Sequence, residues 1–286
     1  LSVRAPTLWD RASQAGLYSC VIGVPLTYPA KPLRGKMLTG PMTANRDSRA
    51  ASYPPELLDE VESDFGRFHF DIQGFRHRSK SELLRELYQL SEQRFDLTEH
   101  WLDHEPWDLM VMVDIAPDRL HHIFWGDMVD SSTPTDSTIF AFYQHLDRRL
   151  ARIEQRMKPD DILLIVSDHG AQTMDGGVAL NQWLIDHHYL KLKESVEPGT
   201  KLAPELVDWR CSKVWAAGGY AGRFYLNITG REPQGIVRPE DVPLLKRELC
   251  DGLRRLETLS GAPMPVEIIE PPTLWKNPKG LPPDLL

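Results

Sequence analysis

The chain has 286 residues, of which 41% are hydrophobic and 26% are charged, so it can bury a sizeable core and has the composition of a globular protein. Its formal net charge of −8 argues against binding to a nucleic acid duplex, and no apolar run of about 18 residues is present to span a membrane. Its three cysteines are widely spaced, which predicts neither a disulfide framework nor a thiolate metal site and favours a reducing, cytoplasmic setting.

The N-terminal part begins with a short predicted helix at residues 6–16 and an apolar strand at residues 17–24. Residues 30–78 are rich in Pro, Gly, Ser and charge and have poor periodicity, so we interpret them as a loop or lid insertion. The hydroxyls of this region, on Thr27 for example, match no nucleophile pattern that we recognise. We therefore assign no catalytic residue here.

Residues 79–101 are predicted to form a helix, because Ser79 begins a capping box and a leucine stripe follows at helical spacing. Residues 109–116 form a strand of the buried type, and Pro117 directly after it is typical of a first helical turn. Asp118 and His122 would then lie on one face of that turn, where both side chains can bind the same metal ion. His100 and His104 have the same spacing, but a solvated helix terminus explains them better.

Residues 133–157 are predicted to form an amphipathic helix, with Thr133 as its N-cap and Pro134 as its first residue. The run Ile-Leu-Leu-Ile-Val-Ser-Asp-His-Gly at residues 162–170 follows. Its five apolar residues suit a strand buried on both faces, which would place Asp168 and His169 at its C-terminal end.

Strand, helix and strand in this order form a βαβ unit, whose strands run parallel and end at the same edge of the sheet. Both Asp/His pairs are therefore expected to converge there. Carboxylates and imidazoles are common ligands of divalent metals, so a dinuclear metal site is the leading interpretation. The alternative is a polar loop cluster in which Asp168 caps a helix and His169 is solvated.

The C-terminal part is predicted to contain a helix at residues 179–190, a hairpin around Gly218 and Gly219, and a helix at residues 240–256. The adjacent His187 and His188 are interpreted as surface residues. Together the elements predict an α/β fold with a mostly parallel central sheet and helices on both faces.

The motifs Asp-x-x-x-His and Ser-Asp-His-Gly resemble those of the alkaline phosphatase superfamily, in particular its type I phosphodiesterase/nucleotide pyrophosphatase branch. Leu-Asn-Gln-Trp-Leu at residues 180–184 and Gly-Arg-Glu-Pro-Gln-Gly at residues 230–235 are similar to later segments of that branch. Further similar segments are Val-Asp-Trp at residues 207–209 and Tyr-Leu-Asn at residues 225–227. The resemblance covers nearly the whole chain.

This resemblance implies a two-metal phosphoryl-transfer site in a single alkaline phosphatase-like domain over residues 1–286. Asp118 and His122 would hold one metal together with a histidine beyond the C-terminus, and Asp168 and His169 would hold the other. The nucleophile would precede residue 1, so the chain is interpreted as a fragment truncated at both ends. We expect residues 1–286 alone to be inactive.

The function that the resemblance implies is metal-dependent hydrolysis of phosphodiesters or nucleotide pyrophosphates by in-line transfer, with a small phosphoester or nucleotide as substrate. Imidazole and carboxylate ligands suit Zn²⁺, Mn²⁺ or Fe, of which zinc or manganese is expected. The alternatives are an inactive superfamily member that serves as a binding module, and a sulfatase or metal-dependent phosphoglycerate mutase. The sequence leaves the natural substrate and the oligomeric state open.

Overall fold

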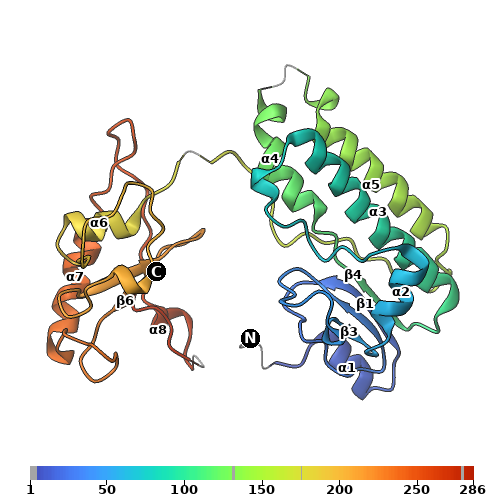
Figure 1. Cartoon of the computed structure of the whole chain (residues 1–286), viewed down its shortest axis with the longest axis horizontal. Coiled ribbons are helices and arrows are strands. Elements are labelled where there is room, and N and C mark those ends of the chain that lie inside the picture. Colours follow the sequence, from blue (N-terminus) through green and yellow to red (C-terminus); the bar gives the residue numbers. More distant parts are fainter. Residues whose placement is uncertain (1–4, 131–132, 175, 278–279) are drawn as a thin grey trace. The chain divides into compact units, whose positions relative to one another are not determined.

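The computed structural model describes residues 5–130, 133–174, 176–277 and 280–286. They form two compact units, Leu1–Thr173 and Met174–Leu286, and Figure 1 labels the elements of both. The single domain expected from the sequence stays a prediction. Within the described ranges, no helix is both long enough and apolar enough to cross a membrane.

The N-terminal unit is built on a four-stranded sheet with the strand order β3-β2-β1-β4. Strand β1 (Ser19–Val24) is central and pairs in parallel with β2 (Gly35–Thr39) and with β4 (Leu109–Met112). The short β3 (Ser52–Tyr53) pairs antiparallel with the outer side of β2. The sheet is therefore mostly parallel, as the sequence predicts.

Helices cover both faces of this sheet. Successive side chains of a strand point to opposite faces, so apolar residues on both sides of β1 need a partner. Cys20 of β1 faces α2 (Leu57–Phe65) and α3 (Lys80–His104) in one buried cluster. Val21, the next residue, packs on the other face with the tryptophan of α1 (Leu8–Gln14). The predicted α/β class with helices on both faces is confirmed.

Helix α3 packs with α4 (Ala116–Val129) and α5 (Thr138–Glu154) around a second buried cluster, and Figure 1 shows the three side by side. The start of α3 is confirmed, since the Ser79 hydroxyl accepts a hydrogen bond from the N–H of the third helical residue. Helix α5 begins later than predicted. Pro134–Asp136 form a separate 3-10 turn, and Ser137 is the N-cap.

Residues 30–78, which the sequence analysis interprets as a loop or lid, contain β2, β3 and α2. They also bury apolar side chains, among them Phe68, Phe70 and Phe75. The segment is therefore part of the core of this unit. A role as a lid stays a prediction.

The buried strand predicted at residues 162–166 is wrong for this structure. These residues form no strand, and their side chains are between 40% and 88% exposed. In the described part of the chain, β4 is the last strand of its sheet and pairs only with β1. An apolar run forms a strand only when a neighbouring strand hydrogen-bonds to its backbone N–H and C=O groups. The composition of the run does not reveal whether such a strand lies beside it.

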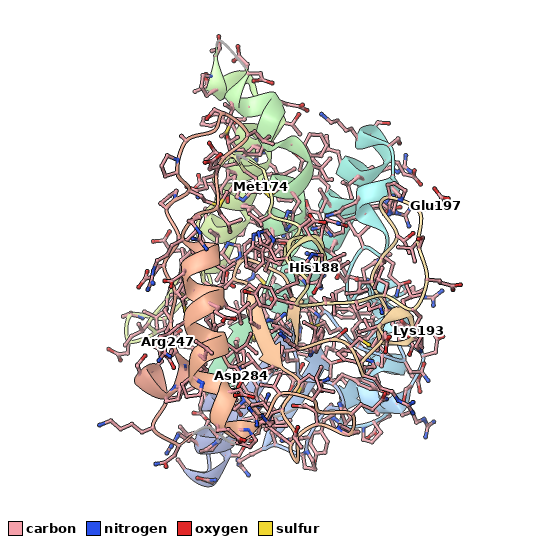
Figure 2. All side chains as sticks on the ribbon, turned by 90° about the vertical axis from the view of Figure 1, so that its left-hand side faces the viewer. Met174, His188, Lys193, Glu197, Arg247 and Asp284 are labelled. Carbon is pink, nitrogen blue, oxygen red and sulfur yellow. The ribbon has the colours of Figure 1, made fainter. Side chains whose placement is uncertain are left out.

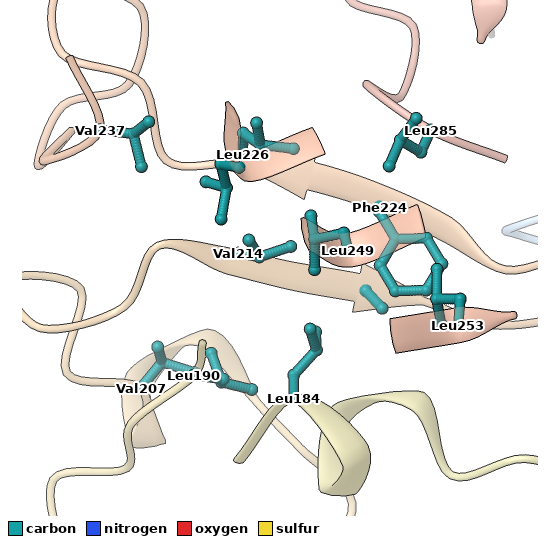
Figure 3. Close-up of a cluster of buried hydrophobic side chains, with 12 residues drawn as sticks. Leu184, Leu190, Val207, Val214, Phe224, Leu226, Val237, Leu249, Leu253 and Leu285 are labelled. Carbon is teal, nitrogen blue, oxygen red and sulfur yellow. The ribbon is translucent and has the colours of Figure 1, made fainter. Parts of the chain in front are cut away.

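The C-terminal unit contains a hairpin of β5 (Val214–Ala217) and β6 (Arg223–Leu226), which confirms the hairpin predicted from the Gly-Gly pair. The helices of this unit are α6 (Leu180–Asp186), α7 (Val242–Leu253) and the short α8 (Pro271–Leu274). Figure 3 shows the core between these elements, which includes Leu184, Val214, Phe224, Leu226, Leu249 and Leu253.

The Gly-Arg-Glu-Pro-Gln-Gly stretch has a structural role in this unit. The Arg231 guanidinium donates to both carboxylate oxygens of Asp284, each at 2.7 Å, and Asp284 also accepts the backbone N–H of Leu226 at 2.7 Å. Asp284 lies beside the hairpin strands in Figure 2. The arginine of this motif thus fixes the segment around Asp284 to β6.

Candidate metal centre

Helix α4 positions the first predicted pair. Asp114 lies between β4 and α4. Its carboxylate accepts hydrogen bonds from the N–H of Ala116 at 3.0 Å and from a serine hydroxyl of α3 at 2.6 Å, which fixes the start of α4. Pro117 lies in the first helical turn, as predicted. Asp118 and His122 therefore stand one turn apart on α4, with 3.6 Å between Asp118 Oδ2 and His122 Nε2.

Asp168 and His169 lie in an irregular segment beside α4. His169 Nε2 is 3.8 Å from Asp118 Oδ1 and 3.7 Å from Asp168 Oδ2. Trp125 of α4 donates its indole N–H to Thr173 Oγ1 at 3.2 Å, which holds the end of this segment against the helix. The structure brings all four predicted residues together, although the strand expected to deliver the second pair is absent from the described elements.

Hydrogen bonding sets the tautomer of His169. Its Nδ1 lies 2.9 Å from the carbonyl oxygen of Gly170, which can only accept, so Nδ1 carries the proton in the neutral ring. The Nε2 lone pair then faces the carboxylates. The Gly170 carbonyl, followed by the charges of Asp168 and Asp118, raises the pKa of His169. A histidine held in this way by a carbonyl is typical of a metal ligand.

The donor set fits a divalent metal in kind. Two carboxylates and two imidazoles supply the oxygen and nitrogen ligands of Zn²⁺ or Mn²⁺. Their contacts run as a chain, His122 to Asp118 to His169 to Asp168, rather than around one point. Among the residues that the structure describes, no three His, Cys, Asp or Glu side chains form a group that could hold a metal ion. The role of the four residues as ligands thus stays a prediction.

His121, adjacent to His122, belongs to a different environment. Its Nε2 is 3.2 Å from the Tyr143 hydroxyl, and its ring stacks on Tyr143 and meets Trp125 edge to face. Burial lowers its pKa, and the charges of His122 and His169 act in the same direction against the opposing effect of Asp118. The two neighbouring histidines therefore have different surroundings, and of these two it is His122 that contacts Asp118.

Sequence reasoning missed two charged residues at this site. Arg119 donates to Asp118 Oδ2 at 2.7 Å and to both carboxylate oxygens of Asp71, at 3.0 and 2.8 Å. An arginine inside the Asp-x-x-x-His motif could have signalled a partner for the carboxylate. No sequence signal indicates Asp71, which comes from the 30–78 segment.

Two of the other histidines considered in the sequence, His104 and His187, bond to helix carbonyls. His104 Nδ1 is 2.8 Å from the carbonyl oxygen of His100, and His187 Nδ1 is 2.8 Å from that of Trp183. The Thr27 hydroxyl donates to the carbonyl of Val24 at 2.6 Å. These contacts agree with the structural roles preferred for these residues.

The comparison with protein families matches the model of the type I phosphodiesterase / nucleotide pyrophosphatase family over residues 2–253. The chain belongs to this family. Membership indicates a hydrolase of the phosphodiester or pyrophosphate type, in a family that is generally metal-dependent. Searches of curated proteins and of solved structures find no match.

Proposed function

We propose that the protein is a metal-dependent phosphohydrolase that cleaves phosphodiesters or nucleotide pyrophosphates at the site formed by α4 and residues 168–169. The observation that carries the proposal is the contact between two Asp/His pairs in a chain of this family. Carboxylate oxygens and imidazole nitrogens are the ligand types that divalent cations bind in proteins. Zinc or manganese suits these ligands.

In this proposal Asp118 and His122 hold one metal ion, and Asp168 and His169 hold the other. Two metal ions would supply charge stabilisation for the attacking and leaving oxygens of an in-line displacement. The chain itself orients the ligands: the first turns of α4 fix Asp118 relative to His122, and the Gly170 carbonyl keeps His169 Nε2 free of a proton in the neutral ring. The attacking group is not assigned to a described residue.

The test is turnover of a chromogenic phosphodiester, bis(p-nitrophenyl) phosphate, by the protein expressed from its complete gene. Replacing His122 by Gln should lower kcat about a hundredfold or more, the order expected when stabilisation of transition-state charge is lost. Alanine at Asp118, Asp168 or His169 should have an effect of the same size. Metal content, measured by elemental analysis, should fall in parallel.

His121→Gln is the matched control, because it makes the same change one position away on α4. It should keep turnover within about threefold, since His121 contacts Tyr143 rather than the carboxylates. Equal loss in both glutamine variants, or full turnover with His122 replaced, would refute the assignment of the ligands. Absence of any phosphodiester turnover in the complete wild-type protein would favour an inactive member of the family.

A further inference from the structure

Arg119 joins two carboxylates and uses every guanidinium nitrogen to do so. Its Nε and Nη2 donate to the two oxygens of Asp71, at 3.0 and 2.8 Å, and its Nη1 donates to Asp118 Oδ2 at 2.7 Å. The side chains of Arg119 and Asp71 are each only 18% exposed. These three bonds use three of the five guanidinium N–H groups, and the partner of Arg119 at the candidate site is Asp118.

The far end of this bridge is itself fixed. Asp71 Oδ1 accepts a hydrogen bond from the backbone N–H of the next residue, Ile72, at 2.8 Å. Arg46 donates to the backbone carbonyl of Asp71 at 3.1 Å. The Arg119 guanidinium carbon lies 4.7 Å from the centre of the Phe75 ring, within the range of a cation–π contact. Arg119 is thus held by a bidentate carboxylate and an aromatic face, in the partly buried setting where such contacts are strongest.

The charges at this bridge balance in a way that suits cation binding. Arg119 alone beside Asp118 would cancel the negative charge that attracts a metal ion. Asp71 neutralises Arg119, so the three side chains together keep one net negative charge.

The bridge also divides the two oxygens of Asp118. Oδ2 accepts from Arg119 and lies 3.6 Å from His122 Nε2, whereas Oδ1 faces His169, whose Nε2 is 3.8 Å away. A carboxylate free to rotate could present either oxygen or both, and ordering it would cost side-chain entropy on binding. With Oδ2 bonded to Arg119, the direction of the carboxylate is fixed before a ligand binds.

We propose that Arg119 and Asp71 form a positioning bridge that fixes the orientation of the Asp118 carboxylate for binding a divalent metal ion. The proposal rests on the proposed function, in which Asp118 is a metal ligand. It adds that Asp71, from the 30–78 segment, helps to position this ligand. Partners that orient a ligand typically contribute 10- to 100-fold to metal affinity.

The experiment measures the dissociation constant of Mn²⁺ by isothermal calorimetry on the complete protein. Asp71→Asn keeps the shape but leaves Arg119 uncompensated beside Asp118, and should weaken Mn²⁺ binding about 10- to 100-fold. Arg119→Lys should also weaken it, because a single ammonium cannot reach both carboxylates as the guanidinium fork does. Asp47→Asn, which breaks the exposed 3.1 Å pair with Arg67 in the same segment, is the control and should change the dissociation constant by less than twofold.

Two further measurements make the outcome decisive. Asp118→Ala is measured in parallel. If it changes neither the number of Mn²⁺ ions bound nor their dissociation constant, the proposed function fails. If it removes or weakens one Mn²⁺ ion while Asp71→Asn stays within threefold of wild type, the bridge alone is overturned. Thermal unfolding without metal separates positioning from folding. A lowered Tm with an unchanged dissociation constant in the Asp71→Asn and Arg119→Lys variants would show a purely structural bridge and overturn the proposal.

Discussion

Asn181 of α6 ties this helix to the hairpin of the C-terminal unit and offers a sharp test of the structure. Its side-chain amide donates to the carbonyl of Ala216 at 2.7 Å and its oxygen accepts the N–H of Ala216 at 2.9 Å. The side chain therefore occupies the edge of β5 as a neighbouring strand would. This contact explains the asparagine in the Leu-Asn-Gln-Trp-Leu motif.

Replacing Asn181 by Ala removes both hydrogen bonds and leaves the N–H and C=O of Ala216 without these partners. Ala216 is only 3% exposed, so water does not readily replace the lost bonds. An unsatisfied buried polar group costs about 1–3 kcal/mol, and two of them should lower the free energy of unfolding of this unit by about 2–4 kcal/mol. Asn181→Asp should cost a similar amount, because a carboxylate oxygen would then face the Ala216 carbonyl.

Hydrogen exchange followed by mass spectrometry reads this change locally, on a peptide that contains β5. At 1.4 kcal/mol for each factor of ten, the expected loss corresponds to exchange of the Ala216 amide that is faster by about 30- to 1000-fold. Peptides of β1 in the N-terminal unit should exchange at the wild-type rate, since no bond there is changed.

The adjacent Gln182→Ala is the matched control. Gln182 is exposed and bonds only along its own helix, to Asp186 at 2.8 Å, so its loss should cost less than about 0.5 kcal/mol. Wild-type protection of β5 in Asn181→Ala, or equal effects of the two variants, would refute the reasoning.

Two other regions give further predictions. Asp284→Ala removes the bidentate partner of Arg231, which keeps Glu232 and the Leu226 carbonyl as acceptors, and it leaves the N–H of Leu226 without the Asp284 acceptor. The free energy of unfolding, measured in urea, should fall by about 2–3 kcal/mol. Asp241→Ala, at an exposed arginine pair, should cost far less, and equal costs would contradict the prediction. Burial raises the pKa of the Cys20 thiol from 9.0 to about 12, so between these pH values the unfolded chain releases a proton that the folded chain keeps, and stability should fall as pH rises. Cys20→Val should reduce that fall in alkaline urea titrations, and an unchanged pH dependence would count against it.

The sequence determined the features that depend on local chemistry. The leucine stripe and the Ser79 cap defined α3, and Pro117 after a strand placed Asp118 and His122 one helical turn apart. The glycine pair predicted the β5–β6 hairpin. These features follow from backbone geometry and side-chain period over a few residues, which a sequence displays directly.

Only the tertiary structure decided the features that depend on a distant partner. The apolar run at residues 162–166 has the composition of a strand but no strand beside it in the described chain, so it stays exposed. Asp71 reaches Arg119 across 48 positions of sequence, and no local pattern marks Asp71 as the partner of that arginine. Hydrogen bonds and ion pairs between remote segments depend on how those segments fold together, and neither propensity nor period carries that information.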